Sequence, residues 1–305
     1  MDYSESKNLP LDKNTGFVHD ISADKKSSLT ILVVEDYGTN QKVVMGHLKN
    51  AGYEADLVEN GQEAVDAFRK KKYDLILMDI QMPVMGGFEA TKTIRDIERK
   101  YVSGQTYGKE EAKDMIYRGR IPIIAMTAHA IKGYKEICKK EGLDDFISKP
   151  LRKTDLLSMV DKWRPKIDDP SLNTGKMSFE SSNISEDTTI HRSSSRDTPI
   201  DYNRALSEFE GDMDLLKRLM EGFMTDVRKQ IKTMHQAIAE GNSELVKREA
   251  HAIKGGAANL TADALSELAL AIEVTGEQKD MDRSAQALTD FEKEFHRFED
   301  YIGGI

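Results

Sequence analysis

The sequence predicts two domains of different fold class, an α/β domain followed by an all-α domain. Short apolar runs alternate with amphipathic helical stretches up to about residue 164, a pattern typical of a parallel sheet covered on both faces. After residue 200 the strand pattern disappears and only helical periodicity remains. The length of 305 residues is consistent with two domains of about 150 residues each.

The composition limits what the chain can do. Charged residues make up 32% and hydrophobic residues 39%, values that exclude a collagen-like or wholly disordered chain. The net charge of −9 disfavours non-specific binding to nucleic acid or to anionic membrane. The single cysteine, Cys138, cannot form an internal disulfide, and no apolar run approaches the roughly 20 residues of a membrane span. The polar, acidic N-terminus lacks signal-peptide features, so we expect a reducing, cytoplasmic location with no membrane span.

The α/β domain is expected over 29–164, after a flexible polar tail over 1–28. Because apolar runs alternate with helical patterns, we expect a doubly wound parallel sheet of five strands. The segment 100–120 is too long and too charged for a simple loop, and suggests an extended helix end or a surface insertion. The strands are expected at 29–34, 54–58, 75–78, 121–126 and 145–148, and the helices at 39–50, 61–70, 88–99, 130–141 and 154–163.

The segment 165–199 differs from both of its neighbours. It contains eight serines and few large apolar residues, so it cannot bury enough surface to offset its ordering entropy, and we expect a disordered linker. Over 200–305 the apolar positions repeat with helical spacing, which predicts an antiparallel four-helix bundle. The four helices are expected at 212–239, 243–260, 262–275 and 281–302.

Polar residues follow three of the apolar strands, namely Glu35–Asp36, Asp79 and Thr127. In an open α/β sheet functional groups gather at the carboxyl ends of the strands, so these side chains are expected to meet. Three carboxylates at one place repel one another unless a hard cation such as Mg²⁺ neutralises them. One of them could then attack phosphorus and form an aspartyl phosphate.

A lysine is also expected near these carboxylates. Lys149 follows the fifth strand and precedes Pro150, and its charge would stabilise a transferred phosphoryl group. The sequence leaves the isomer of this X–Pro bond open, although most such bonds are trans. An acid at the end of any single strand is usually a helix cap or a solvated loop group. The prediction therefore depends on all of these elements occurring together, in order.

The region 29–164 resembles the response-regulator receiver domain, whose sheet is flavodoxin-like. The resemblance lies in Glu35–Asp36, Asp79 within DIQMPVMGG, Thr127 within IIAMTAHA, Phe146 and Lys149–Pro150. It implies that Asp79 is the phosphoacceptor, and that Mg²⁺ is held by the three carboxylates and the backbone carbonyl of Gln81. It also implies that Thr127 and Lys149 bind the phosphoryl oxygens. Phe146 would change rotamer when Thr127 moves and so display the phosphorylation state at the surface.

In the all-α domain His251 has an unusual environment. At about 100° per residue, His251 shares one helix face with Lys247, Lys254 and Gly255, opposite the apolar face. Glycines within a helix cost about 1 kcal/mol each relative to alanine. The Gly255–Gly256 pair is therefore explained either by another domain approaching the imidazole closely or by tight helix packing inside the bundle.

The segment HAIKGGAANL resembles the motif of histidine phosphotransfer domains, over about 200–302. The resemblance implies that His251 is a phosphoacceptor and that Lys254 helps to hold the phosphate. Thr261 occupies a position where many relatives carry glycine, which leaves the local helix geometry open.

Together these resemblances imply a phosphorelay. A sensor histidine kinase would phosphorylate Asp79, Asp79 would exchange the group with His251, and a downstream response-regulator receiver would accept it. The linker, with a root-mean-square span of roughly 30–35 Å, would allow the two domains to dock within one chain. Alternatively, the chain is a phosphorylation-dependent binding module whose two domains serve separate partners. The sequence also leaves the direction of phosphate flow open.

Autonomous kinase activity is not expected. The sequence contains no GxxxxGK[ST] loop and no second histidine in a kinase-like setting, so the chain would act as a phosphotransfer intermediate without an ATP-binding domain. The helical third is acidic, and nothing in the sequence predicts nucleic-acid binding.

Overall fold

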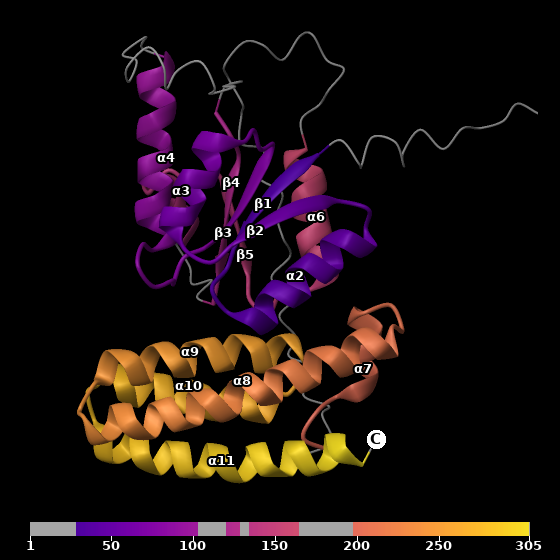
Figure 1. Cartoon of the computed structure of the whole chain (residues 1–305), viewed down its shortest axis with the longest axis vertical. Coiled ribbons are helices and arrows are strands. Elements are labelled where there is room, and N and C mark those ends of the chain that lie inside the picture. Colours follow the sequence, from indigo (N-terminus) through magenta and orange to yellow (C-terminus); the bar gives the residue numbers. More distant parts are fainter. Residues whose placement is uncertain (1–28, 103–119, 129–133, 165–197, 305) are drawn as a thin grey trace, which may run out of the picture.

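The computed structural model of the chain describes residues 29–102, 120–128, 134–164 and 198–304. The predicted tail over 1–28, nearly all of the predicted linker and most of the segment 100–120 lie outside the described residues. The described part contains an α/β domain and a helical domain, which contact each other (Figure 1).

The α/β domain is built on a parallel sheet of five strands in the order β2-β1-β3-β4-β5. This confirms the predicted fold class and sheet. The central strands are continuous runs of branched and apolar residues buried on both faces, because helices cover both sides. The strands are β1 (Thr30–Val34), β2 (Glu54–Val58), β3 (Leu75–Asp79), β4 (Ile123–Thr127) and β5 (Asp145–Ser148).

Two apolar cores lie on opposite faces of the sheet. One is formed with α2 (Gly38–Asn50) and α6 (Lys153–Trp163). The other is formed with α3 (Gly61–Lys70), α4 (Gly87–Val102) and α5 (Tyr134–Lys140). The expected helix over 130–141 is described only from Tyr134 onward. Asp79 and Thr127 are the last residues of their strands rather than the first residues beyond them, a shift of one or two positions from the predicted bounds.

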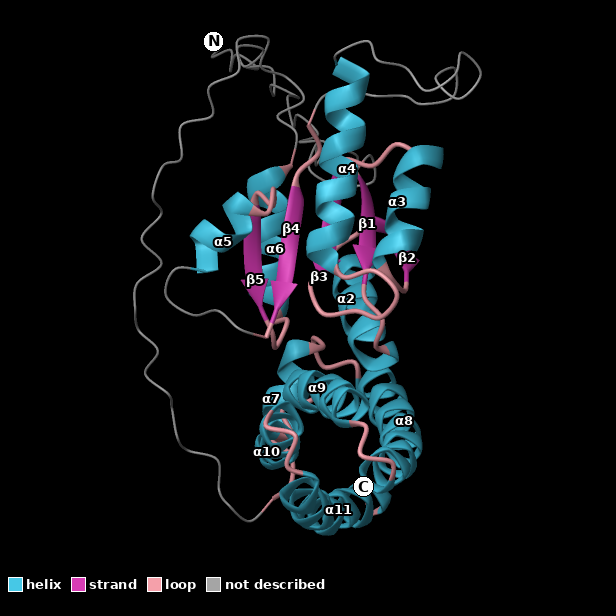
Figure 2. Cartoon of the chain, turned by 90° about the vertical axis from the view of Figure 1, so that its left-hand side faces the viewer, coloured by secondary structure: helices cyan, strands magenta, loops and turns pink. Residues whose placement is uncertain are grey.

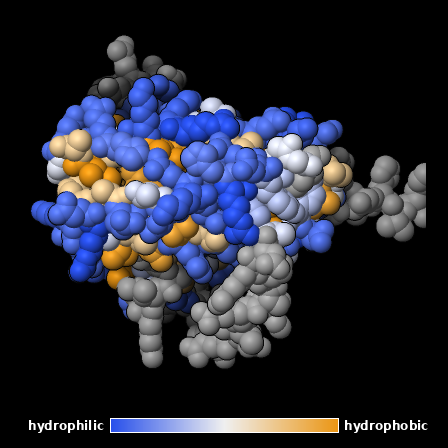
Figure 3. Space-filling view, turned by 90° about the horizontal axis from the view of Figure 1, so that it is seen from below, coloured by the Kyte–Doolittle hydropathy of each residue, from blue (hydrophilic) through white to orange (hydrophobic). Residues whose placement is uncertain are grey.

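The C-terminal domain is helical, as predicted. Four long helices surround one core: α8 (Met213–Ala239), α9 (Ser243–Asn259), α10 (Asp263–Glu277) and α11 (Met281–Gly303). Figure 2 shows them nearly end-on below the sheet, and Figure 3 shows the mostly hydrophilic outer surface of this end of the molecule. A further short helix, α7 (Tyr202–Glu208), precedes them and was not expected from the sequence.

The two domains meet along α2. This helix contacts α8 and α9, and its residue Val43 is part of the core of the helical domain. Figure 2 shows the arrowheads of β4 and β5 pointing toward the helical domain. The carboxyl ends of the strands, where the functional side chains were expected, therefore face α9.

Candidate functional site

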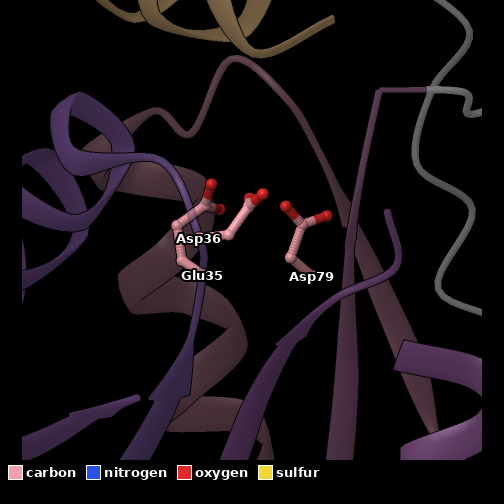
Figure 4. A group of neighbouring side chains, drawn as sticks. All are labelled: Glu35, Asp36 and Asp79. Atoms are coloured by element: carbon pink, nitrogen blue, oxygen red, sulfur yellow. The ribbon is translucent and has the colours of Figure 1, made fainter. Parts of the chain in front are cut away.

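The structure brings together the three carboxylates that the sequence singled out. Glu35 and Asp36 follow β1, Asp79 ends the neighbouring β3, and one oxygen of each lies within 4.8 Å of the others (Figure 4). The side chain of Glu35 is fully buried, and that of Asp79 nearly so. An all-oxygen cluster of this kind has the donor chemistry of a site for a hard cation such as Mg²⁺.

Lys149 contacts two of these carboxylates. Its Nζ donates hydrogen bonds to Glu35 Oε2 at 2.8 Å and to Asp79 Oδ2 at 2.7 Å. The peptide bond from Lys149 to Pro150 is cis. Burial lowers the pKa of the Lys149 amine, but the charges of Asp79 and Glu35 outweigh this, so the pKa is raised and the lysine stays protonated.

The positive charges near the acidic cluster do not fully compensate the negative charges of its carboxylates. Burial and the neighbouring charge of Asp79 raise the pKa of Glu35. The same two causes raise the pKa of Asp36 to about 6, while the charges of Lys149 and His251 oppose the shift. A bound divalent cation would relieve this repulsion, so the residues present fit such an ion.

Thr127, at the end of β4, is linked to Phe146 through an intervening tyrosine. Tyr134 of α5 shares a hydrogen bond with the side chain of Thr127. The Tyr134 ring meets the Phe146 ring edge-on, with the centroids 5.5 Å apart. A movement of Thr127 can therefore reach Phe146 through Tyr134, which the sequence analysis did not identify. The backbone N–H of Gln81 donates to Asp79 Oδ1 at 3.2 Å, and the role of the Gln81 carbonyl stays a prediction.

In the helical domain Glu273 of α10 orients His251. One Glu273 oxygen lies 2.7 Å from His251 Nδ1, and the other accepts a hydrogen bond from Lys254 Nζ at 2.5 Å. Burial alone would raise the pKa of Glu273, but these two contacts lower it to about 2. Glu273 is therefore ionised at neutral pH and can only accept, so His251 Nδ1 must carry the proton. In the neutral ring the lone pair then lies on Nε2.

The contact between the domains places α9, the helix that carries His251, against α2, the helix that follows Glu35 and Asp36. Along α2, Tyr37 donates to Gln230 Oε1 of α8 at 3.1 Å. Near the other end of α2, the His47 ring stacks on Phe209 with centroids 5.3 Å apart. Between these two contacts, Asn40 bonds to Asn259, the last residue of α9.

The glycine pair turns out to serve both suggested purposes. A Cβ at Gly256 would lie 2.6 Å from a Tyr37 ring carbon of the α/β domain and 3.2 Å from the Phe223 ring inside the bundle. A Cβ at Gly255 would lie 3.3 Å from the side chain of Asn40, also in the α/β domain. Close domain approach therefore involves both glycines, and tight helix packing requires Gly256. Gly255 is buried rather than exposed because the α/β domain covers it.

The expected site residues thus form two groups, around Asp79 and around His251, and α2 joins them. Sequence reasoning missed the residues that orient these groups, namely Tyr37, Asn40, Tyr134, Asn259 and Glu273. Glu273 and Tyr134 contact His251 and Thr127 from other elements, whereas Tyr37, Asn40 and Asn259 make hydrogen bonds between the two domains. No local spacing in the sequence reports such contacts.

Comparisons with known proteins agree with both domains. Residues 31–161 match the model of the response regulator receiver domain, and residues 218–301 match the Hpt domain. The hybrid signal transduction histidine kinase B of Dictyostelium discoideum is 39% identical over 132 residues, which are 43% of this chain and 6% of that protein. The probable histidine kinase 4 of Oryza sativa subsp. japonica is 40% identical over 137 residues, which are 44% of this chain and 14% of that protein. The chain therefore spans only a small part of the length of these relatives.

A solved structure of the receiver domain of a sensor histidine kinase from Pseudomonas aeruginosa is also similar. It is 34% identical, with a TM-score of 0.35, and covers 44% of this chain and 96% of that one. None of the described helices combines the length and the apolar character that a membrane span needs.

A receiver domain and an Hpt domain in one chain indicate a protein of the two-component phosphorelay class. The chain carries a response-regulator receiver domain over residues 31–161, followed by an Hpt domain over residues 218–301. The relatives of the chain include hybrid histidine kinases.

Proposed function

We propose that this chain carries a phosphoryl group between Asp79 and His251. The observation that supports this most directly is the contact of α9, the helix that carries His251, with the receiver beside its acidic cluster. Asn259 of α9 donates a hydrogen bond to Asn40, and Asn40 in turn donates to Glu35 of the cluster. The donor would be a sensor histidine kinase, and the acceptor after His251 would be a downstream response-regulator receiver.

Each group has a defined role in this transfer. The Nε2 lone pair of His251 attacks the phosphorus of the acyl phosphate on Asp79. The P–N bond forms, the P–O bond to Asp79 breaks, and its electron pair returns to the carboxylate. Glu273 keeps the proton on Nδ1, so no proton has to leave the ring during the step. The reverse transfer uses the same groups.

The receiver residues would stabilise the charge of the transferred group. Lys149, bonded to Asp79, is placed to contact its phosphoryl oxygens, and Thr127 is the other expected donor. Glu35, Asp36, Asp79 and the Gln81 carbonyl would hold Mg²⁺, which when bound offsets negative charge on the phosphoryl oxygens. Lys254, held by Glu273 beside His251, would neutralise the phosphohistidine.

Site-resolved phosphate mapping tests this proposal. The full chain is incubated with acetyl phosphate and Mg²⁺, and phosphorylated residues are located by mass spectrometry in the wild type, Asp79→Asn and His251→Gln. We expect phosphohistidine in the wild type and none in Asp79→Asn, while His251→Gln keeps phosphate on Asp79. Phosphate confined to Asp79 in the wild type would contradict the transfer. It would favour two domains that serve separate partners.

A further inference from the structure

The side chain of Asn259 joins the Hpt domain to two separate parts of the receiver. Its Oδ1 accepts a hydrogen bond from the backbone N–H of Leu151 at 2.8 Å, and its Nδ2 donates to Asn40 Oδ1 at 2.8 Å. Asn259 is the last residue of α9 and is only 6% exposed. Both hydrogen-bonding ends of this buried amide are therefore satisfied by the other domain.

The two receiver partners of Asn259 belong to the phosphate site. Leu151 follows Lys149 and Pro150 directly, so the loop that bonds to Asn259 also carries the Asp79-bound lysine. On the other side, Asn40 Nδ2 donates to Glu35 Oε1 at 2.8 Å. A closed ring of contacts thus runs from Asn259 through Asn40, Glu35 and the lysine loop back to Asn259.

The two hydrogen bonds of the Asn259 amide differ in how far they depend on the sequence of the receiver. The N–H of Leu151 is a backbone group, and any receiver without proline at this position would offer the same donor. This bond therefore positions the Hpt domain on the receiver but does not distinguish one receiver from another. Asn40 is a side chain, and its orientation is fixed because its own Nδ2 already donates to Glu35. Its Oδ1 therefore faces the donor of Asn259. A receiver without an acceptor at this position would leave the Asn259 donor buried and unpaired.

We propose that Asn259 is a specificity-determining and positioning residue for phosphoryl exchange. It selects receivers that carry an amide acceptor at the position of Asn40, and it places His251, two helical turns earlier on α9, over the carboxyl ends of the strands. This inference rests on the proposed exchange between Asp79 and His251.

The test compares three single variants in the full chain. Asn259→Ala removes both bonds, and Asn259→Asp keeps the acceptor for Leu151 but loses the donor to Asn40. Asn203→Ala replaces an exposed asparagine of α7 as the matched control. The rate at which phosphate moves from Asp79 to His251 is expected to fall about tenfold in Asn259→Ala, and at least as far in Asn259→Asp. It should stay at the wild-type value in the control.

A spectroscopic measurement separates this role from general stability. In ¹H–¹⁵N spectra of the unphosphorylated chain, the Leu151 backbone amide signal should shift in Asn259→Ala and stay close to its wild-type position in Asn259→Asp. A double-mutant cycle with Asn40→Ala should show a smaller effect of Asn259→Ala when Asn40 is absent.

Two results would overturn the inference while leaving the proposed function in place. One is a wild-type transfer rate in Asn259→Ala, and the other is an equal loss with and without Asn40. Absence of phosphohistidine in the wild type would instead overturn the proposed exchange, and this inference with it.

Discussion

The substitution Gly256→Ala tests whether the two domains must approach closely. The new Cβ would lie 2.6 Å from a Tyr37 ring carbon. Carbon atoms in contact prefer about 3.5–4.0 Å, so the overlap is roughly 1 Å. Overpacking of this size costs typically 1–3 kcal/mol. Because Tyr37 belongs to the receiver and Gly256 to the Hpt domain, separation of the domains relieves most of this strain.

The expected result is therefore a loss of docking rather than of folding. A cost of 1–3 kcal/mol corresponds to about a 5- to 150-fold shift in the docking equilibrium, and the rate of phosphate transfer to His251 should fall accordingly. Within the bundle the new methyl crowds the Phe223 ring at 3.2 Å, while alanine favours the helix by about 1 kcal/mol. We therefore expect the unfolding temperature of the Hpt domain to change little.

Two further variants make the measurement decisive. Gly222→Ala on α8 also points a methyl at the receiver, but it meets only the Nζ end of Lys42, which can swing away. This variant should transfer phosphate at the wild-type rate, within about twofold. Tyr37→Ala removes the ring that Gly256→Ala would strike, so the effect of Gly256→Ala should shrink in that background. An undiminished transfer rate in Gly256→Ala, or an equal loss without Tyr37, would refute the close-approach argument.

Three other predictions follow from buried groups. Burial and the charge of Lys153 lower the pKa of His47 from 6.5 to about 4. The contribution of the neutral His47 ring to domain docking is therefore complete above pH 6.5 and is lost as the pH falls toward 4. His47→Phe should abolish this part of the pH dependence of docking, measured by ¹H–¹⁵N spectra. The pKa of Glu273 is lowered from the ordinary value of 4.5 to about 2. Its stabilisation of the bundle is therefore complete above pH 4.5 and is lost as the pH falls through 2. Glu273→Gln should reduce the fall of the unfolding temperature at acidic pH and should slow phosphate transfer to His251. Arg95 donates to Glu98, Asp144 and two carbonyls in a buried network, so Arg95→Ala should destabilise the receiver by about 3–5 kcal/mol in urea unfolding. The exposed pair of Arg99 with Asp96 is the control, and Arg99→Ala should cost at most about 1 kcal/mol.

The parallel sheet could be predicted because each strand is recognisable from its own run of apolar residues, without knowledge of contacts to distant residues. Leu75–Asp79 has the pattern of a buried strand that ends in a carboxylate. Its neighbour β1 is followed directly by Glu35, and its other neighbour β4 ends in Thr127. Once the strands are assigned, the geometry of a parallel sheet brings Glu35, Asp79 and Lys149 together. The helices of the C-terminal domain were equally clear, because their apolar stripes repeat over many turns.

The contacts that orient the site could not be predicted from the same patterns. Glu273 lies 22 residues after His251 and meets it only because α9 and α10 pack side by side. Asn259 and Asn40 belong to different domains and are 219 positions apart. Thr261 was noted as a departure from glycine, and the structure places it at a φ of 59°. Its hydroxyl donates to the carbonyl oxygen of Asp201, a bond that glycine could not make.

The contact between α2 and α9 also implies competition. While Asn40 and Tyr37 of the chain's own receiver lie against α9, a receiver from another protein cannot contact His251 in the same way. A tether of 35 residues, the length of the predicted linker, keeps the attached receiver at an effective concentration of order millimolar. A free receiver present at micromolar concentration could then bind the Hpt domain only after the attached receiver has dissociated from it. We therefore expect the undocking rate, rather than the chemical step, to limit how fast phosphate leaves the chain.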